Sequence, residues 1–405
     1  MIRTVCVAAL LSLTPLPALA APTHWVGSWA AAQQLPEPQN ALAPADLHDA
    51  TLRQVVRLSI GGSRIRLRLS NAFGTQPLVI DGVHVARALS PGGARIDPAS
   101  DHDVTFNGAA SVTIPAGASY LSDPVAMTAA PLSVLAVSLH LPEAPDRQTG
   151  HPGSRSTSYL VHGNQSAAAD LPDAQKVEHW YQLAGIEVEA SAGAVVTLGD
   201  SITDGHGATT NGNDRWPDRL AERLQASPAT RGLSVLNEGI GGNRLLLDGL
   251  GPNALARLDR DVLAQAGVRT VVLLEGVNDL GTLTRDAPVP PEGHAALVAQ
   301  IIGAYRQIVE RAHAQGVKVI GATILPYAGS TYYHPDAANE ADRQAVNRWI
   351  REPGHFDGMV DFDRVTRDPA HPDRLRPDFD SGDHLHPSPA GYKAMANAVP
   401  LALLH

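Results

Sequence analysis

The hydrophobic pattern of the chain changes near residue 190, and this change constrains the fold more than any other feature. Before it, short apolar runs are separated by clusters of Gly, Pro and Asp, which is typical of antiparallel β structure. After it, apolar runs alternate with segments of helical periodicity, which predicts a parallel sheet with helices on both faces. Since 405 residues suffice for two domains, we expect an N-terminal domain over 21–190 and an α/β domain over 191–405.

In the first half, apolar residues alternate with polar ones over 52–60 and again over 64–69. The pair Gly61-Gly62 between these runs predicts a hairpin turn. Together with the later apolar runs, this pattern predicts an antiparallel β-sandwich with one face in water. The polar segment 151–165 is expected to form a loop near the domain junction. The later runs lie at 78–85, 112–114, 132–139 and 186–188. The arginines of the second run are expected on the solvated face rather than on a binding surface: Arg64, Arg66 and Arg68.

In the second half, strands and helices are expected to alternate throughout. The predicted strands are 195–198, 233–236, 271–274, 317–324 and 359–362, and the predicted helices are 216–224, 254–266, 295–315, 337–350 and 390–404. In such a sheet the catalytic groups gather at the carboxyl ends of the strands. Residues that could take part in catalysis follow the carboxyl ends of three predicted strands and also occur in one loop near the C-terminus.

The first twenty residues have the features of a secretory signal. Arg3 precedes a short apolar run over 5–13, and Ala18-Leu19-Ala20 is a small-x-small cleavage site. The run is too short to span a bilayer, and the alternative is a buried N-terminal helix. We therefore expect a secreted or periplasmic protein, cleaved after Ala20. The one cysteine, Cys6, lies inside this signal, so the mature chain would have neither disulfides nor thiolate chemistry.

Composition excludes some classes of partner. The contents of 44% apolar and 18% charged residues suit a globular protein. A net charge of −10 argues against nucleic-acid binding, since a phosphate backbone needs a basic face. Beyond the signal, no stretch is long and apolar enough to cross a membrane, so no stable membrane anchor is expected.

Ser201 is the candidate nucleophile. It follows a predicted strand in Gly199-Asp200-Ser201, where the glycine would let the chain turn sharply from strand into helix. The hydroxyl would then lie at a helix N-terminus beside free backbone N–H groups. A serine alcohol needs a base to become nucleophilic. The alternative is that Ser201 only caps the helix.

Asp383 and His386 are the candidate partners of that serine. They are three positions apart, so in a turn the carboxylate can reach Nδ1 of the imidazole and direct Nε2 toward the serine. The alternatives are surface histidines or a metal pair formed by His384 and His386. A metal site is disfavoured because the chain has no H-E-x-x-H motif and no cysteine ligand. His384 is left without a role.

A tetrahedral intermediate also needs hydrogen-bond donors for its oxyanion. Three candidates are the backbone N–H of Ser201, the backbone N–H of Gly242 and the side-chain amide of Asn278. Taken singly, Gly242 could serve only a turn with positive φ, and Asn278 could be a loop or cap residue. Asp279 is expected to be a helix cap.

These blocks resemble the SGNH hydrolase family, also called GDSL esterases and lipases. They are the Gly-Asp-Ser at 199–201, the glycine at 242, the Gly-x-Asn-Asp at 276–279 and the Asp-x-x-His at 383–386. The resemblance implies a flavodoxin-like α/β/α domain that needs no metal or cofactor. It also implies a triad of Ser201, His386 and Asp383, with Ser201, Gly242 and Asn278 as oxyanion hole.

The N-terminal domain and the Trp-Val-Gly-Ser-Trp at 25–29 are similar to secreted bacterial members grouped with xylan-esterase-like enzymes. No Gly-x-Ser-x-Gly occurs in the sequence, which excludes the ordinary α/β-hydrolase elbow. We expect a serine esterase that removes short acyl groups, such as acetyl, from a small-molecule or polysaccharide ester. Alternatives are a lipase or lysophospholipase, a glycosidase or transferase, and a non-catalytic carbohydrate-binding protein. The segment 327–334 follows a strand end and is expected to line the pocket, with surface packing as the alternative.

Overall fold

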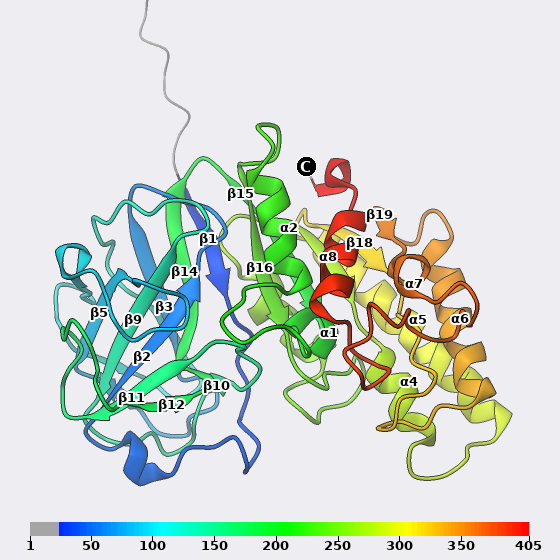
Figure 1. Cartoon of the computed structure of the whole chain (residues 1–405), viewed down its shortest axis with the longest axis horizontal. Helices are drawn as coiled ribbons and strands as arrows, with labels where there is room; N and C mark the ends of the chain where they lie inside the picture. The colour runs from blue at the N-terminus through cyan, green and yellow to red at the C-terminus, as the bar shows by residue number, and fades with distance from the viewer. Residues whose placement is uncertain (1–23, 405) are drawn as a thin grey trace, which may run out of the picture.

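The computed structural model describes residues 24–404. Named strands up to β14 (Leu183–Ala190) pair antiparallel, and those from β15 (Gly193–Gly199) onward pair parallel. The two groups lie side by side (Figure 1). The expected signal, its cleavage site after Ala20 and Cys6 lie outside the described residues.

Two main antiparallel sheets form the N-terminal half. One has the order β1-β14-β3-β8, and the other has the order β12-β11-β2-β9-β5-β6. Apolar side chains of both sheets, such as Leu67 and Leu139, belong to one hydrophobic core. The strands are β1 (His24–Ala30), β2 (Ala50–Arg57), β3 (Ile65–Ser70), β5 (Gly82–Arg87), β6 (His102–Asp103), β8 (Ser119–Leu121), β9 (Val134–Leu141), β11 (Ser158–His162) and β12 (Gln175–Val177).

Smaller elements complete this half. Two-stranded sheets pair β4 (Leu78–Ile80) with β7 (Val112–Ile114) and β10 (Gly150–His151) with β13 (Trp180–Tyr181). Two short 3-10 helices, η1 (Pro44–Leu47) and η2 (Pro98–Ser100), lie between strands. Part of the segment expected as a loop, 151–165, is instead strand β11, which pairs with β2.

The hairpin expected at Gly61-Gly62 is wrong. β2 and β3 lie in different sheets, so the chain passes from one sheet to the other at these glycines. A Cβ at Gly61 would lie 2.3 Å from the backbone oxygen of Ala129, and one at Gly62 would lie 2.7 Å from Cβ of Val188. The glycines therefore allow two backbone segments to pass close to each other, and they do not form a tight turn.

Arg66 and Arg68 of β3, together with Arg64 just before it, do not form a simple solvated face. Arg66 donates to Glu187 of the neighbouring strand β14 at 2.7 Å, and Arg68 also pairs with Glu187. Arg64 pairs with Glu189. The side chain of Glu187 is only 2% exposed, so these cross-strand ion pairs are partly shielded from water.

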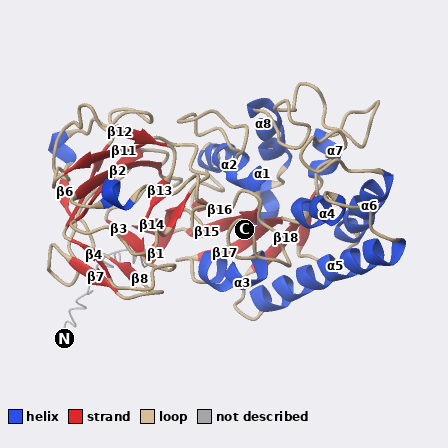
Figure 2. Cartoon of the chain, turned by 90° about the horizontal axis from the view of Figure 1, so that it is seen from below, coloured by secondary structure: helices blue, strands red, loops and turns tan. Residues whose placement is uncertain are grey.

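The second half is built on a five-stranded parallel sheet in the order β16-β15-β17-β18-β19. Counted within this domain the order is 2-1-3-4-5, the flavodoxin-like arrangement. The new strands are β16 (Leu233–Gly239), β17 (Val268–Leu274), β18 (Lys318–Ala322) and β19 (Gly358–Val360). Helices α2 (Trp216–Gln225) and α8 (Pro389–Ala398) cover one face, and α3 (Ala254–Leu258) and α5 (Pro291–His313) cover the other (Figure 2). The remaining helices are α1 (Ser201–Asp204), α4 (Val277–Thr284), α6 (Ala337–Arg351) and α7 (Phe362–Thr366).

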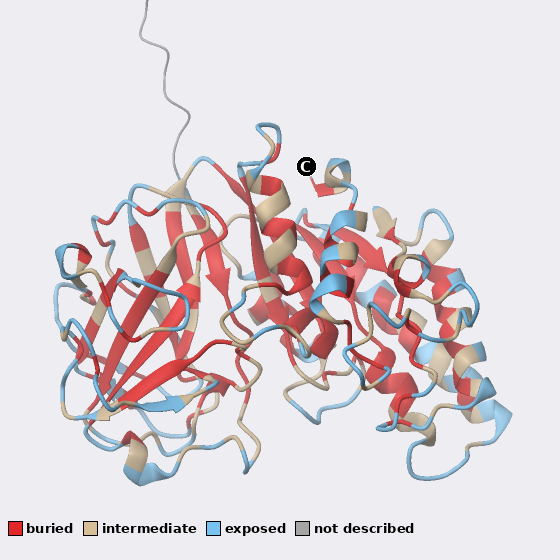
Figure 3. Cartoon of the chain, viewed as in Figure 1, coloured by how far each residue is buried: buried red, intermediate tan, exposed pale blue. Residues whose placement is uncertain are grey.

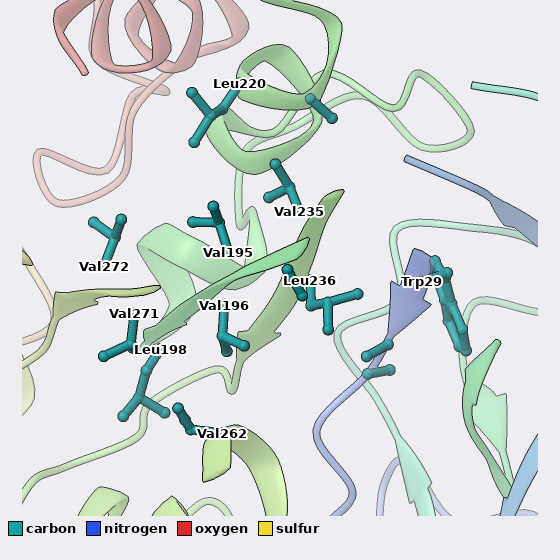
Figure 4. Packing of buried hydrophobic residues seen from close by; sticks show 14 of the residues in the cluster. Trp29, Val195, Val196, Leu198, Leu220, Val235, Leu236, Val262, Val271 and Val272 are labelled. Atoms are coloured by element: carbon teal, nitrogen blue, oxygen red, sulfur yellow. The ribbon is translucent and has the colours of Figure 1, made fainter. Parts of the chain in front are cut away.

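The central strand β15 is buried on both faces, which explains its continuous apolar sequence. Val195 points toward Leu220 of α2, while Leu198 lies near Val262 on the opposite side (Figure 4). Buried residues follow the sheets, whereas the outer faces of the helices are exposed (Figure 3). Trp29 of β1 belongs to the same core, so the two halves share their packing.

Two predicted helices are shorter than expected. The last one, predicted over 390–404, ends at Ala398 because Pro400 cannot continue it, and the 3-10 helix η4 (Leu401–Leu404) follows. The helix predicted over 254–266 continues from α3 as a single π turn, η3 (Asp259–Leu263). Among the helices described, none is long and apolar enough to cross a membrane.

Candidate active site

The candidate residues follow the ends of three neighbouring strands. Gly199 at the end of β15 lies opposite Gly239 of β16 on one side and Leu274 of β17 on the other. Ser201, Gly242 and Asn278 come two to four residues after these ends. Because the strands are parallel, their carboxyl ends bring the three residues to one edge of the sheet.

Ser201 is the first residue of α1, and its hydroxyl is not used as a cap. Asp200 holds the cap position and accepts a hydrogen bond from the N–H of Ile202 at 2.9 Å. The alternative that Ser201 caps the helix is therefore wrong. A glycine is required at position 199 because a side chain there would clash with its neighbours, and not because its φ is positive. A Cβ there would lie 2.1 Å from Oγ1 of Thr203 and 2.7 Å from the backbone oxygen of Leu274.

Ser201, His386 and Asp383 form a continuous hydrogen-bonded chain. The hydroxyl of Ser201 lies 2.8 Å from Nε2 of His386, and Nδ1 of His386 lies 2.6 Å from Oδ2 of Asp383. A carboxylate accepts at Nδ1, so Nδ1 carries the proton and Nε2 is free to accept from the serine. The structure thus brings together all three residues expected to form the triad.

The loop around Asp383 holds this geometry. Oδ1 of Asp383 accepts from the backbone N–H groups of Leu385 at 3.0 Å and His386 at 2.8 Å. Partial burial would raise the pKa of Asp383, but the hydrogen bonds and positive field of His386 outweigh it and lower that pKa below the usual range. Asp383 therefore stays ionised at neutral pH.

The expected oxyanion donors also meet beside Ser201. Gly242 has φ of 71°, and Asn278 lies in the first turn of α4. One amide hydrogen of Asn278 Nδ2 is donated to the backbone oxygen of Asn243 at 2.7 Å, while Oδ1 accepts from the hydroxyl of Tyr333. The second amide hydrogen remains for a ligand. Ser201, Gly242 and Asn278 all line one pocket.

Asp279 does not cap a helix as expected. Its carboxylate accepts from the N–H groups of Leu245 at 2.9 Å and Leu246 at 3.2 Å, and so ties α4 to the loop that carries Gly242. Burial raises the pKa of Asp279 to about 6. Its position fixes the spacing between two of the candidate oxyanion donors.

A cluster of buried charged side chains around Arg257 contacts the carboxyl ends of the strands. The guanidinium of Arg257 donates to the backbone oxygens of Glu238 at 2.7 Å and Gly199 at 3.0 Å. The carboxylate of Glu275 lies 3.5 Å from the same guanidinium. Burial and the nearby Asp200 raise the pKa of Glu275 well above its ordinary value. Burial also raises the pKa of Asp200, to about 7.

Both halves of the chain line the pocket, whose volume is about 560 Å³. The α/β domain supplies the candidate catalytic residues with Leu250, Tyr332 and Tyr333, so the segment 327–334 lines the pocket as expected. Tyr327 itself is buried in the core. The N-terminal half adds a mainly polar wall: Gln34, Glu37, Gln39, Asn40, Arg155, Glu178 and His179.

Sequence reasoning missed His206 and Arg155. The ring of His206 lies 4.1 Å from that of His386, and Arg155 donates to Nδ1 of His206 at 2.8 Å. His206 is near Ser201 in sequence, but it belongs to no recognisable spacing, and Arg155 comes from the other half. The only hint in the sequence that Arg155 lies near the active site was the expectation that segment 151–165 is close to the domain junction.

The metal alternative involves different residues from those expected. His384 hydrogen-bonds Asp380 at 2.6 Å and is not among the residues that line the pocket with Ser201. His206, Asp383 and His386 offer ligand atoms within 4.8 Å of one another. Both ring nitrogens of His386 are already used, by Ser201 and Asp383. This arrangement favours proton transfer along the chain over metal ligation.

Comparison with known proteins agrees with this geometry. Residues 197–394 match the GDSL-like Lipase/Acylhydrolase family. This match supports a GDSL-like acylhydrolase domain over these residues. The protein is accordingly an ester-hydrolysing enzyme. No match was found among curated proteins.

Several solved structures resemble the GDSL-like domain. A GDSL-like lipase from Bacteroides thetaiotaomicron is 22% identical, with TM-score 0.38, and the match covers 52% of this chain and 87% of that one. A catalytic mutant of an acetylxylan esterase from Geobacillus stearothermophilus is 22% identical, with TM-score 0.38, covering 52% and 94%. An alpha/beta hydrolase from the metagenome of Lake Arreo, Spain, is 25% identical, with TM-score 0.37, covering 53% and 96%.

Proposed function

We propose that this enzyme is a secreted serine esterase that removes short acyl groups, acetyl above all, from a polysaccharide. The observation that carries the catalytic part is the hydrogen-bonded chain from Ser201 through His386 to Asp383. In this proposal Ser201 attacks the ester carbonyl while Nε2 of His386 takes its proton. His386 then protonates the leaving alcohol, and water, activated by the same nitrogen, releases the acid from the acyl-enzyme.

The oxyanion of each tetrahedral intermediate would be held by three donors. These are the N–H groups of Ser201 and Gly242 and the remaining amide hydrogen of Asn278. All three residues line the pocket next to the hydroxyl of Ser201. Since Asp383 stays ionised, it stabilises the imidazolium that His386 becomes during attack.

The walls of the pocket support a small acyl group and a polar alcohol. A Cβ at Gly242 would lie 2.4 Å from Cδ1 of Leu250, so this side chain packs against the residue that carries one candidate oxyanion donor. The ring of Tyr333 stands beside the second donor, Asn278. A long acyl chain leaving the reacting carbon on that side would meet these two side chains. On the other side, Glu37 and Glu178 belong to a polar wall that suits a hydroxyl-rich glycan.

The N-terminal half has a structural part in this proposal. We propose that its two antiparallel sheets form a β-sandwich whose loops build the polar wall of the pocket.

The signal expected over 1–20 would bring the enzyme to polymers outside the cytoplasm. Export is tested by expressing the full chain and sequencing the N-terminus of the recovered protein, which should begin at Ala21. Recovery of an uncleaved chain in the cytoplasm would contradict this part.

One observation favours the alternative of a lipase or lysophospholipase. Two large apolar or aromatic side chains that line the pocket stay exposed, namely Tyr332 at 57% and Leu250 at 39%. Such a rim could contact an acyl chain or a lipid surface.

The two functions differ in their substrate preference. We would measure kcat/KM for p-nitrophenyl esters of increasing acyl length, together with acetate release from acetylated xylan, with Ser201→Ala as the blank. Preference for acetate and butyrate esters with acetate release supports the glycan esterase. Preference for long chains without acetate release supports the lipase.

A further inference from the structure

A loop of the N-terminal half is fixed against the nucleophile helix. At its start, Nε2 of His151 lies 2.8 Å from Oδ1 of Asp204, the last residue of α1, and both side chains are buried. Further along, the backbone oxygen of Arg155 accepts from the N–H of Asn211 at 2.8 Å. The N–H of Thr157 also donates to Oδ1 of Asn211 at 2.8 Å. The loop 152–157 is therefore anchored to the GDSL-like domain on both sides of Arg155, so the position of Arg155 is set by contacts with the other half of the chain.

From this loop, Arg155 reaches His206. A terminal nitrogen of its guanidinium lies 2.8 Å from Nδ1 of His206. A guanidinium only donates hydrogen bonds, so Nδ1 of His206 must accept and the ring must be neutral with its proton on Nε2. This tautomer points an N–H toward Oδ2 of Asp383, which lies 3.8 Å away.

His206 is also held firmly by its backbone. Its N–H donates to the oxygen of Ser201 at 2.9 Å, and its own oxygen accepts from the hydroxyl of Tyr392 at 2.6 Å. The ring packs on His386 with centroids 4.1 Å apart. One face of the imidazole of His386 is thus covered by a ring whose position depends on an arginine from the other half of the chain.

The geometry points to a positioning pair. We propose that Arg155 and His206 together hold the imidazole of His386 in its working orientation, so that the N-terminal half completes the active site. This inference rests on the proposed ester hydrolysis. Neither residue bonds the substrate in this role. They restrict the ring that must accept a proton from Ser201 and pass it to the leaving group, and such orientation is a large part of catalytic rate.

The charges around His206 also determine its protonation state. The charged or titratable groups that face His206 are His386, Arg155, Asp383 and Asp204. Burial, then the positive fields of His386 and Arg155, lower the pKa of His206 to about 4, although Asp383 and Asp204 oppose this. A neutral neighbour does not oppose the imidazolium that forms on His386 in the transition state.

The tautomer is tested without any substrate. Nitrogen-15 NMR of the ring nitrogens in the full-length protein should show His206 neutral at pH 6, with its proton on Nε2. In Arg155→Met the hydrogen bond and the positive charge are both lost, so His206 should begin to titrate at higher pH. Arg231→Met removes an exposed arginine at the far end of the sheet and should leave the His206 signals unchanged. A proton on Nδ1 of His206 in the unmodified protein would overturn the arrangement.

Kinetics test whether Arg155 acts through His206. Arg155→Met should lower kcat for p-nitrophenyl acetate about 10- to 100-fold with little change in KM. The acid limb of the pH profile should become steeper, because His206 must then also be deprotonated. Arg155→Lys keeps a cationic donor and should recover part of the loss.

A double-variant cycle separates positioning from substrate contact. His206→Gln keeps an acceptor for Arg155 but cannot titrate. In that background, Arg155→Met should change kcat less than about threefold, since coupled residues are non-additive. Full additivity of the two losses would show that Arg155 acts on the substrate directly, and the proposal would be wrong. Lack of ester hydrolysis by the unmodified protein would instead refute the proposed function, while the NMR experiment would still decide the arrangement.

Discussion

The hydroxyl of Tyr333 donates a hydrogen bond to Oδ1 of Asn278 and thereby fixes which end of the amide faces Ser201. The backbone oxygen of Asn243 takes one hydrogen of Nδ2 at 2.7 Å. With both contacts made, the amide cannot flip, and its second hydrogen is left for the oxyanion in the proposed mechanism. Tyr333, in the loop after β18, thus orients the side-chain amide of Asn278 on α4.

Tyr333→Phe should therefore reduce kcat while leaving KM nearly unchanged. A hydrogen bond between neutral groups contributes about 1 kcal/mol, which corresponds to about a fivefold loss of rate. Removal of the donor itself in Asn278→Ala should lower kcat more, by about 10²- to 10³-fold. Tyr332→Phe is the matched control, because Tyr332 is exposed and its hydroxyl accepts from Arg285 at 3.4 Å. Steady-state kinetics on p-nitrophenyl acetate would measure all three, and a pure KM effect would make Asn278 a substrate-binding residue.

Ser201→Ala should abolish turnover without disturbing the fold. The hydroxyl would be the atom that carries the acyl group, and loss of a triad member reduces the rate about 10⁴- to 10⁶-fold. The side chain does not cap α1, so thermal unfolding should be nearly unchanged. Mass spectrometry of the quenched native enzyme should find the acyl group on the peptide that contains Ser201. Retention of more than about a tenth of the activity would contradict this role.

Gly242→Ala should damage activity beyond its effect on stability. The residue has φ of 71°, and a Cβ would lie 2.4 Å from Cδ1 of Leu250, so either the side chain of Leu250 or the backbone at Gly242 must shift. Gly316→Ala is a matched control, because Gly316 has φ of 70° and open space around its Cβ position. Both changes should destabilise the fold by about 1 kcal/mol, but only Gly242→Ala should lower kcat. Equal kcat values for the two variants would argue against a donor at Gly242.

Glu275→Gln should stabilise the protein at alkaline pH. Burial and Asp200 raise the pKa of Glu275, and burial raises the pKa of Asp200 to about 7. The folded state therefore holds protons that the unfolded chain releases above about pH 4. The contribution of Asp200 to the free energy of unfolding is complete below about pH 4 and is lost as pH rises through about 7, and that of Glu275 is lost as pH rises through its own raised pKa.

The glutamine cannot ionise but still accepts from Arg257. We expect Glu275→Gln to raise the free energy of unfolding at pH 8 by about 1–2 kcal/mol and to have little effect at pH 4. Urea unfolding at both pH values would measure this difference. Glu292→Gln, an exposed glutamate in the first turn of α5, is the control and should show no such pH-dependent gain. An equal gain at both pH values would exclude proton uptake as the cause.

The α/β half and its candidate triad and oxyanion residues could be predicted from the amino-acid sequence alone. Strand and helix alternated after residue 190, and a parallel sheet brings the carboxyl ends of its strands to one edge. Residues placed just after those ends, such as Ser201 and Asn278, must then lie close together. The Asp383–His386 pair is also local, since three residues of one turn suffice to join the carboxylate to the ring.

How the two halves of the chain contact each other could not be predicted in this way, because it depends on the folded arrangement. Gly61-Gly62 read as a hairpin from local pattern, yet close backbone crossing between two sheets governs the conformation there. The bond from Arg155 to His206 joins residues 51 positions apart, and that from Tyr333 to Asn278 spans 55. Such contacts carry no periodicity or spacing that a single sequence could reveal. Their partners are chosen by how the folded elements pack, which brings distant side chains within hydrogen-bond reach only after the chain has folded.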